Sequence, residues 1–314
     1  MPEVSPARVA YVTADVFTDT PCAGNQLAVI PDARGLVTSQ MAALTREFNY
    51  PETVFVLPPD KPAHTRRLRI FTPGMEMPFA GHPTVGTAFV LAATGGIPLD
   101  GDETRIVFEE GIGPIPVLIR AKGGKPEFTQ LSVFKLPETR PTADVATLTR
   151  VLSLEPGDIL ATGPHTPAAV SCGVPFVMVP VRDRRTLGRA GVRMDEWRAH
   201  FGNAWAKDFM VFALDPERPG SDVRVRMFGP GVGVAEDPAT GGGVTPLGGY
   251  LAAASPTQTG TIRYVMEQGF EMGRPSILHV EVDRAAGAIT AVRVGGSTVL
   301  MAQGSMLVPP ASQA

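Results

Sequence analysis

The sequence contains an internal repeat, and this repeat constrains the fold more than any other feature. The segment RIFTPG at 69–74 recurs as RMFGPG at 226–231, with four identities at an offset of 157 residues. Upstream, GNQLAVIP at 24–31 similarly resembles GVPFVMVP at 173–180. Several matches in the same order at a nearly constant offset indicate a duplication. We therefore expect two similar domains.

A segment rich in small and apolar residues follows each of these repeats. AGHPTVGTAFVLAA predicts a helix from about Pro83 to Thr94, and EDPATGGGVTPLGGYLAAA contains its counterpart, in which Pro246 is expected to kink the helix or delay its start. A helix that is apolar on every face belongs in the middle of a core. With many short strands between Gly and Pro turns, this predicts an α+β fold of two pseudo-symmetric domains, each a barrel-like, mostly antiparallel sheet wrapped around a central helix.

The length of 314 residues also suits two domains of about 150 residues each. We place the first domain at 1–127, completed by a C-terminal strand at 298–314, and the second at 128–297. A helix is predicted at 38–49 with Thr38 as its N-cap. Strands are predicted in the first half at 8–17, 27–31, 53–59 and 66–72.

Charge and hydropathy exclude several classes of protein. The net charge is −3, and no basic cluster is interleaved with aromatic residues, so no nucleic-acid partner is expected. The sequence has no apolar run of 18 residues and no signal-peptide pattern at its start, so we expect no membrane association and a cytoplasmic location.

Other common cofactor and nucleophile motifs are missing. Cys22 and Cys172 cannot form a zinc site alone, and we expect both to be buried, reduced and small. Neither GxxxxGK[ST] nor GxSxG occurs, and GPGVGV at 229–234 lacks dinucleotide-loop spacing. Trp197 and Trp205 are predicted to be core anchors. No metal and no cofactor is expected.

A titratable residue precedes a proline near each predicted central helix. His82 precedes Pro83, and Asp237 precedes Pro238. Proline suits the first turn of a helix, so we expect both helices to begin there. Taken singly, either residue is more often structural than catalytic; the paired occurrence favours function.

Glycines beside these residues would let the backbone approach a bound group. They are Gly81 before the histidine, and Gly241 and Gly242 after the aspartate. If the two domains face each other, two helix N-termini would point into one cleft and attract an anion, most simply a carboxylate. A small carboxylate-bearing substrate is the resulting hypothesis.

Glu52 is the third candidate for the chemistry. It opens the apolar strand ETVFV, where a carboxyl in apolar surroundings would have a raised pKa and could exchange protons near neutral pH. The alternative is a solvated glutamate at the end of a strand.

These residues lie in blocks that resemble the PhzF family of phenazine-biosynthesis-like isomerases, whose fold is similar to diaminopimelate epimerase. The blocks run in family order from about residue 15 to 278, and the pair GHPT and EDPAT is their most specific feature. They are DVFTDTPCAGNQLAVI, ETVFV, RIFTPGMEMPFAGHPTVGTAFVL, EDPATGGG and QGFEMGRPSIL.

The resemblance implies a homodimer and an isomerase of the trans-2,3-dihydro-3-hydroxyanthranilate type that needs no cofactor. By this resemblance, Glu52 matches the family's catalytic glutamate, His82 with Gly81 matches its Gly-His pair, Asp237 matches the aspartate of the second motif, and the backbone of Gly241 helps to hold the substrate. We expect Glu52, His82 and Asp237 to be catalytic, and we expect the substrate to be bound by Gly81, Thr240, Gly241 and Gly242. The sequence departs from the family where Gly242 stands in place of a common serine.

Three functions remain open at this point. The first is an isomerase that moves a proton on a small carboxylic acid. The second is a non-catalytic binding or interaction protein that keeps the fold and the anion-binding cleft. In this case the missing hydroxyl at Gly242 would indicate that the catalytic chemistry has been lost. The third is a racemase or epimerase that uses carboxylate and histidine, since the two-cysteine mechanism is disfavoured by the positions of Cys22 and Cys172.

Overall fold

The structure is a computed structural model that describes residues 7–311, and these form two compact units. One unit combines the chain up to Leu131 with the residues from Gly296 onward, and the other runs from Ser132 to Gly295. The second unit is therefore inserted between two parts of the first. Residues 1–6 and 312–314, which include the end of the predicted strand 298–314, lie outside the described part.

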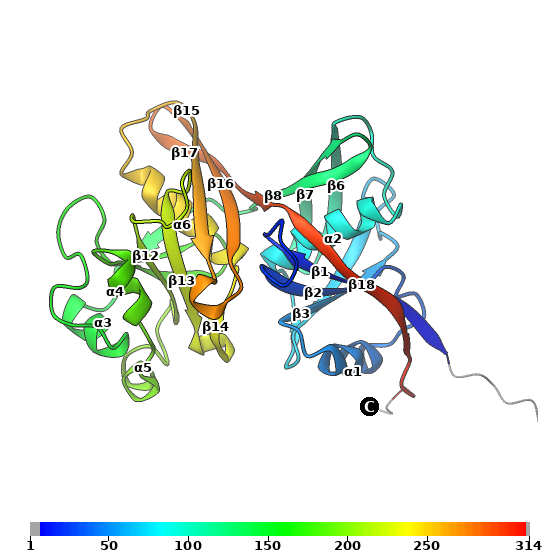
Figure 1. Cartoon of the computed structure of the whole chain (residues 1–314), viewed down its shortest axis with the longest axis horizontal. Coiled ribbons are helices and arrows are strands. Elements are labelled where there is room, and N and C mark those ends of the chain that lie inside the picture. The colour runs from blue at the N-terminus through cyan, green and yellow to red at the C-terminus, as the bar shows by residue number, and fades with distance from the viewer. Residues whose placement is uncertain (1–6, 312–314) are drawn as a thin grey trace, which may run out of the picture. The chain divides into compact units, whose positions relative to one another are not determined.

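The first unit is a strand-rich layer around one long buried helix (Figure 1). Its elements are β1 (Arg8–Val16), β2 (Asn25–Ile30), α1 (Thr38–Phe48), β3 (Glu52–Leu57), β4 (Arg66–Phe71), β5 (Glu76–Met77), α2 (Gly81–Ala93), β6 (Glu103–Glu110), β7 (Gly113–Lys122), β8 (Lys125–Ser132) and β18 (Thr298–Leu307).

The second unit repeats this order and adds two outer helices. Its elements are β9 (Glu138–Arg140), α3 (Val145–Val151), β10 (Ala168–Ser171), β11 (Pro175–Pro180), α4 (Arg184–Arg189), α5 (Met194–His200), β12 (Asp208–Ala213), β13 (Val223–Gly229), η1 (Pro230–Val232), β14 (Val234–Asp237), α6 (Gly241–Ala253), β15 (Gly260–Gln268), η2 (Phe270–Met272), β16 (Ser276–Ala285) and β17 (Ala288–Gly296).

Strand pairing follows the same pattern in both units. In the first, β18, β1 and β2 pair antiparallel, β2 and β3 parallel, β3 and β4 antiparallel, and β4 and β6 parallel. In the second, β9, β10 and β11 pair antiparallel, β11 and β12 parallel, β12 and β13 antiparallel, and β13 and β15 parallel. The sheets are mostly antiparallel, as predicted, and β18 occupies in the first unit the place of β9 in the second.

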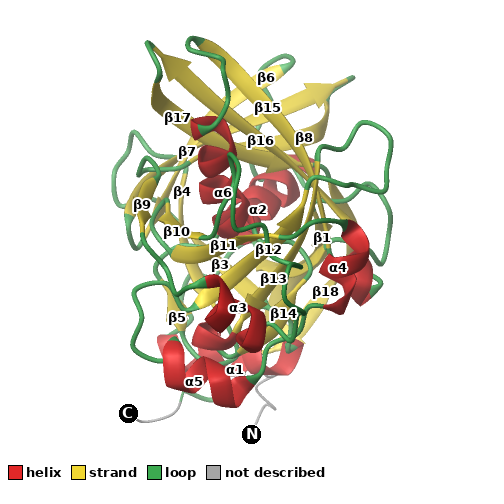
Figure 2. Cartoon of the chain, turned by 90° about the vertical axis from the view of Figure 1, so that its left-hand side faces the viewer, coloured by secondary structure: helices red, strands yellow, loops and turns green. Residues whose placement is uncertain are grey.

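The central helices α2 and α6 lie among the strands in Figure 2 and are buried along nearly their whole length. Small residues allow this close packing. A Cβ added at Gly86 would lie 2.5 Å from a methyl group of Val16, and one at Gly248 would lie 2.5 Å from a methyl group of Val280. The α+β fold with a central helix in each unit is thus present.

Two predicted helix starts need correction. The N-cap of α1 is Val37, whose N–H donates to the Gln40 side chain, and Thr38 is the first helical residue. In the second unit, α6 begins at Gly241 and contains Pro246, whose missing N–H leaves the carbonyl of Gly242 without its usual helical donor. The Thr245 hydroxyl donates to the Gly242 carbonyl instead, over 3.5 Å.

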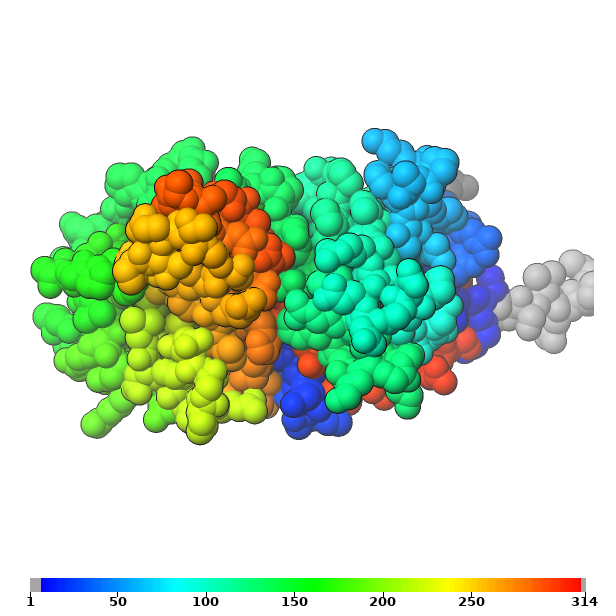
Figure 3. Space-filling model, turned by 90° about the horizontal axis from the view of Figure 1, so that it is seen from above, coloured from blue at the N-terminus to red at the C-terminus, as the bar shows by residue number. Residues whose placement is uncertain are grey.

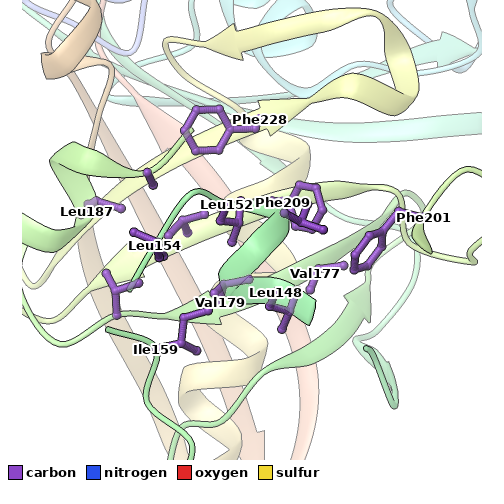
Figure 4. Packing of buried hydrophobic residues seen from close by; sticks show 14 of the residues in the cluster. Leu148, Leu152, Leu154, Ile159, Val177, Val179, Leu187, Phe201, Phe209 and Phe228 are labelled. Atoms are coloured by element: carbon purple, nitrogen blue, oxygen red, sulfur yellow. The ribbon is translucent and has the colours of Figure 1, made fainter. Parts of the chain in front are cut away.

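The outer helices of the second unit pack on a separate apolar cluster (Figure 4). Phe201 and Phe209 meet edge to face with ring centroids 4.9 Å apart. Trp197 and Trp205 pack against the margin of this cluster, and the Trp197 indole donates to the Lys207 carbonyl over 2.8 Å. Both tryptophans are therefore core anchors, as predicted.

The ends of the hairpins are exposed. In the second unit, the start of β15 pairs with the end of β16, and these segments lie at the surface in orange tones in Figure 3.

Within residues 7–311, every helix is too short or too polar to cross a membrane.

Candidate active site

Glu52 and His82 meet in the first unit. Glu52 is the first residue of β3 and pairs with Leu27 on the parallel strand β2, while His82 is the second residue of α2. The imidazole Nε2 lies 3.3 Å from the Glu52 carboxylate Oε2. Both side chains are largely shielded from solvent, with exposed fractions of 6% for His82 and 17% for Glu52. A titratable pair is therefore built at the start of the central helix.

The surroundings of His82 favour the neutral form of its ring. Burial lowers its pKa to about 3, and a hydrogen bond to the Gln26 backbone opposes this shift only in part. That bond raises the pKa because the ring donates to the carbonyl, so the N–H of the neutral ring is used there. The nitrogen that faces Glu52 is then a hydrogen-bond acceptor.

The second candidate group lies around the start of α6. Asp237 is the last residue of β14, and its carboxylate Oδ2 accepts a short hydrogen bond of 2.5 Å from the Thr240 hydroxyl. Thr240 is the N-cap of α6, but its side chain does not cap the helix. The first amides of α6, at Gly241 and Gly242, therefore lack helical acceptors in the way common to helix N-termini.

The starts of the two central helices are less alike than the sequence predicted. Pro83 lies within the first turn of α2, but Pro238 lies before α6, because Asp237 is held in β14 opposite Met227. The predicted helix start at Pro238 is wrong. Gly81 and Gly241 are the equivalent first helical residues, so the residue in the position of His82 is Gly242.

Glu110 is a buried acid that sequence reasoning missed. It ends β6, is 8% exposed, and places Oε1 2.6 Å from the Thr84 hydroxyl in the first turn of α2. That hydroxyl also lies 2.7 Å from the Ala80 carbonyl. The Thr84 hydroxyl is thus within reach of two acceptors, Glu110 Oε1 and the Ala80 carbonyl, and its one hydrogen serves one of them at a time. Burial raises the pKa of Glu110 to about 8, and the hydrogen bond from Thr84 opposes this shift only in part.

A pocket of about 660 Å³ adjoins this acid in the first unit. It lies where β4 and β6 diverge, and Leu68, Met77, Pro78 and Glu110 are among its lining residues. Glu52 and His82 are not part of its lining.

The cysteines differ in their surroundings. Cys172 is buried, and desolvation raises the pKa of its thiol to about 12, so it is not a thiolate near neutral pH. Cys22 is exposed, which corrects the expectation that both are buried. Within residues 7–311, no cluster of three His, Cys, Asp or Glu side chains is arranged to hold a metal ion.

Comparison with known proteins places this chain in a family. The model of the family described as phenazine biosynthesis-like protein matches residues 14–304. An uncharacterized isomerase from Mesorhizobium japonicum is 39% identical over 95% of this chain and 98% of its own length. The trans-2,3-dihydro-3-hydroxyanthranilate isomerase of Pseudomonas aeruginosa is 31% identical over 94% of this chain and 98% of its own length.

Solved structures support the fold. A PhzF-family phenazine biosynthesis protein from Bacillus anthracis matches with a TM-score of 0.86 at 23% identity, covering 96% of this chain and all of the other. A hydroxyproline epimerase from Agrobacterium vitis matches with a TM-score of 0.64 at 13% identity, covering 96% and 94%. The chain belongs to the phenazine biosynthesis-like PhzF family of isomerases.

Proposed function

We propose that this protein is a cofactor-independent isomerase that moves a proton between two carbons of a small carboxylic acid. The observation that carries the proposal is the 3.3 Å approach of Glu52 Oε2 to the neutral, buried His82 Nε2. The 31% identical relative named trans-2,3-dihydro-3-hydroxyanthranilate isomerase makes that compound the first substrate to test.

Glu52 is the proposed proton carrier. As a carboxylate it takes a proton from one carbon of the substrate, and as a carboxylic acid it returns a proton to another carbon of the same molecule. The atoms balance, because the product is an isomer of the substrate. The neutral His82 nitrogen, 3.3 Å away, offers an acceptor to the protonated form of Glu52 and no donor to its carboxylate form, so it favours the state in which Glu52 carries the proton.

The start of α6 is the proposed binding element. The amides at Gly241 and Gly242 suit an anionic group, because helix N-termini carry partial positive charge. Asp237 and Thr240 add an acceptor and a hydroxyl for a polar substituent of the substrate. Gly81 has the corresponding place at the start of α2.

The test is Glu52→Gln, followed by NMR of trans-2,3-dihydro-3-hydroxyanthranilate in D2O. We expect turnover and deuterium incorporation to fall by about 1,000-fold or more, since the variant retains shape but loses the proton carrier. Glu47→Gln, which changes an exposed carboxylate on α1, is the matched control and should behave as the wild type. Undiminished incorporation in Glu52→Gln would refute the role of Glu52.

The same experiment separates catalysis from binding alone. If the wild-type protein broadens the ligand signals but incorporates no deuterium into this or related carboxylates, the binding-protein alternative is supported. If label enters with inversion at one carbon and without a double-bond shift, the protein is an epimerase.

A further inference from the structure

Gln268 is a wholly buried amide beside Asp237 and Thr240. It is the last residue of β15 and has no exposed surface. The parallel pairing of β13 with β15 sets Gln268 opposite Val225. This register brings the side chain to the segment that joins β14 to α6.

The amide makes three hydrogen bonds to that segment. Its Nε2 donates to the Asp237 carbonyl over 2.7 Å and to the Thr240 hydroxyl over 2.9 Å. Its Oε1 accepts from the Thr240 N–H over 3.1 Å. The reverse orientation would face the nitrogen towards an N–H donor and the oxygen towards a carbonyl, so the observed orientation is the one that satisfies all three partners.

These contacts fix the direction of the Thr240 hydroxyl. Because the hydroxyl oxygen receives a hydrogen from Gln268, its own hydrogen is directed to Asp237 Oδ2, 2.5 Å away. We propose that Gln268 is a positioning residue of the isomerase: it holds Thr240 as a donor to Asp237 and fixes the turn that precedes α6. This inference rests on the proposed function only in so far as Asp237 and Thr240 bind substrate.

The first unit has a buried side chain at the equivalent position, but it is a carboxyl rather than an amide. Arg67 pairs with Glu109 across β4 and β6, as Arg224 pairs with Glu267 across β13 and β15. The residue after each glutamate is Glu110 in one unit and Gln268 in the other. Both side chains have the same length, and each forms hydrogen bonds at the start of its central helix: Glu110 with Thr84 in the first turn of α2, and Gln268 with Thr240, the N-cap of α6.

The neighbouring glutamates confirm this correspondence. Glu109 accepts hydrogen bonds from two successive backbone amides, those of Asp60 and Lys61. Glu267 accepts from the successive amides of Glu217 and Arg218. The duplicated position therefore anchors the helix start, and in the second unit the anchor must donate two hydrogens, which an amide can do and an ionised carboxylate cannot.

The test compares Gln268→Glu with Gln268→Ala in the full-length protein. At pH 9.5, above the range in which burial keeps the equivalent Glu110 protonated, the ionised glutamate presents only acceptors to the Asp237 carbonyl and the Thr240 oxygen, so we expect kcat/KM for trans-2,3-dihydro-3-hydroxyanthranilate to fall by about tenfold or more. At pH 5.5 a protonated carboxyl can donate one hydrogen, so part of the activity should return relative to wild type. Gln268→Ala should lose activity without this recovery.

The charged groups around position 268 bear on the comparison of activities at two pH values. Asp237 on β14 is the acid whose backbone the side chain contacts. On the adjoining strands and η2, Arg224 pairs with Glu267 and Glu271, and Arg226 on β13 pairs with Glu236 on β14. Arg274, on the turn that leads to β16, is the further cation near this end of β15, and exposed Gln258→Glu serves as the matched control.

A second measurement does not depend on turnover. Hydrogen exchange of the peptide covering residues 237–244 should accelerate in Gln268→Glu and Gln268→Ala but not in Gln258→Glu. Thr240→Val should remove most of the additional effect of Gln268→Glu on exchange, since Gln268 acts through Thr240. If the wild type turns over no substrate, these exchange data alone support or overturn the positioning role.

Three results would overturn the proposal. One is unchanged exchange in both Gln268 variants. Another is equal loss of activity in both variants at every pH. The third is full additivity of Gln268→Glu and Thr240→Val, because independent effects would mean that the amide does not act through the hydroxyl.

Discussion

Replacing Glu110 by glutamine should make the protein progressively more stable than the wild type as the pH rises. Glu110 keeps its proton in the folded state near neutral pH because burial disfavours the ionised carboxylate, and the hydrogen bond from the Thr84 hydroxyl offsets this only in part. The unfolded chain releases that proton near the ordinary pKa of 4.5, whereas the folded protein releases it at about 8. Glutamine has the shape of the protonated acid but never ionises.

The magnitude follows from the two pKa values. Between them the folded state holds one proton more than the unfolded state, so the free energy of unfolding falls by about 1.4 kcal/mol per pH unit and is constant outside this window. The full difference is about 5 kcal/mol. Partial positive charge at the start of α2 favours the ionised form by up to about 1 kcal/mol, which leaves about 4 kcal/mol.

The assay is urea unfolding of both proteins at pH 5.5 and pH 8.5. The advantage of Glu110→Gln should grow by about 3 kcal/mol between these two values. Trp197 and Trp205 both lie in the second unit, so the first unit is better followed by circular dichroism and by hydrogen exchange of residues 81–93. Glu103→Gln changes an exposed carboxylate on the same strand and should show no such trend.

A difference between Glu110→Gln and wild type that stays constant from pH 5.5 to pH 8.5 would refute the reasoning. It would mean that Glu110 is already ionised in the folded protein at the lower pH.

Two further predictions follow from glycine and cysteine surroundings. Gly242→Ser should fold normally, because a Cβ at this position meets no atom within 4 Å. Its free energy of unfolding should rise by about 0.5 kcal/mol from the higher helix propensity of serine. Thermal unfolding checks this, and a loss of stability of more than about 1 kcal/mol would show that the space is not free. Iodoacetamide at pH 8 should modify Cys22 but leave Cys172 unmodified until the protein unfolds, since burial raises the pKa of the Cys172 thiol to about 12. Mass spectrometry of the labelled native protein measures this. Rapid labelling of Cys172 in the native protein would contradict its burial.

The repeat predicted the architecture well because duplicated segments must pack in the same way. Both central helices could be predicted from their uniform apolar composition, and α2 lies within about two residues of its predicted start. The second helix start was misplaced because Asp-Pro is a common entry to a helix. Here the pairing of β14 with β13 holds Asp237 in a strand instead.

The contacts of the candidate site could be predicted less well. Glu52 and His82 were both identified, but their approach depends on β3 and α2 packing together, which local sequence does not report. Glu110 and Gln268 were missed because their importance comes from the register of two parallel strand pairs. The available signal was the equivalent position of Glu109-Glu110 and Glu267-Gln268 in the repeat.

The pairing of β1 with β18 also bears on how the chain folds. Arg8 lies opposite Leu307, so the first unit closes only after nearly the whole chain has left the ribosome. The inserted second unit is continuous from Ser132 to Gly295 and can form its contacts earlier. Until β18 is added, β1 presents an open edge that another strand could occupy. During synthesis, β1 is thus made before the other described strands but gains β18 as a neighbour only after the second unit has been made.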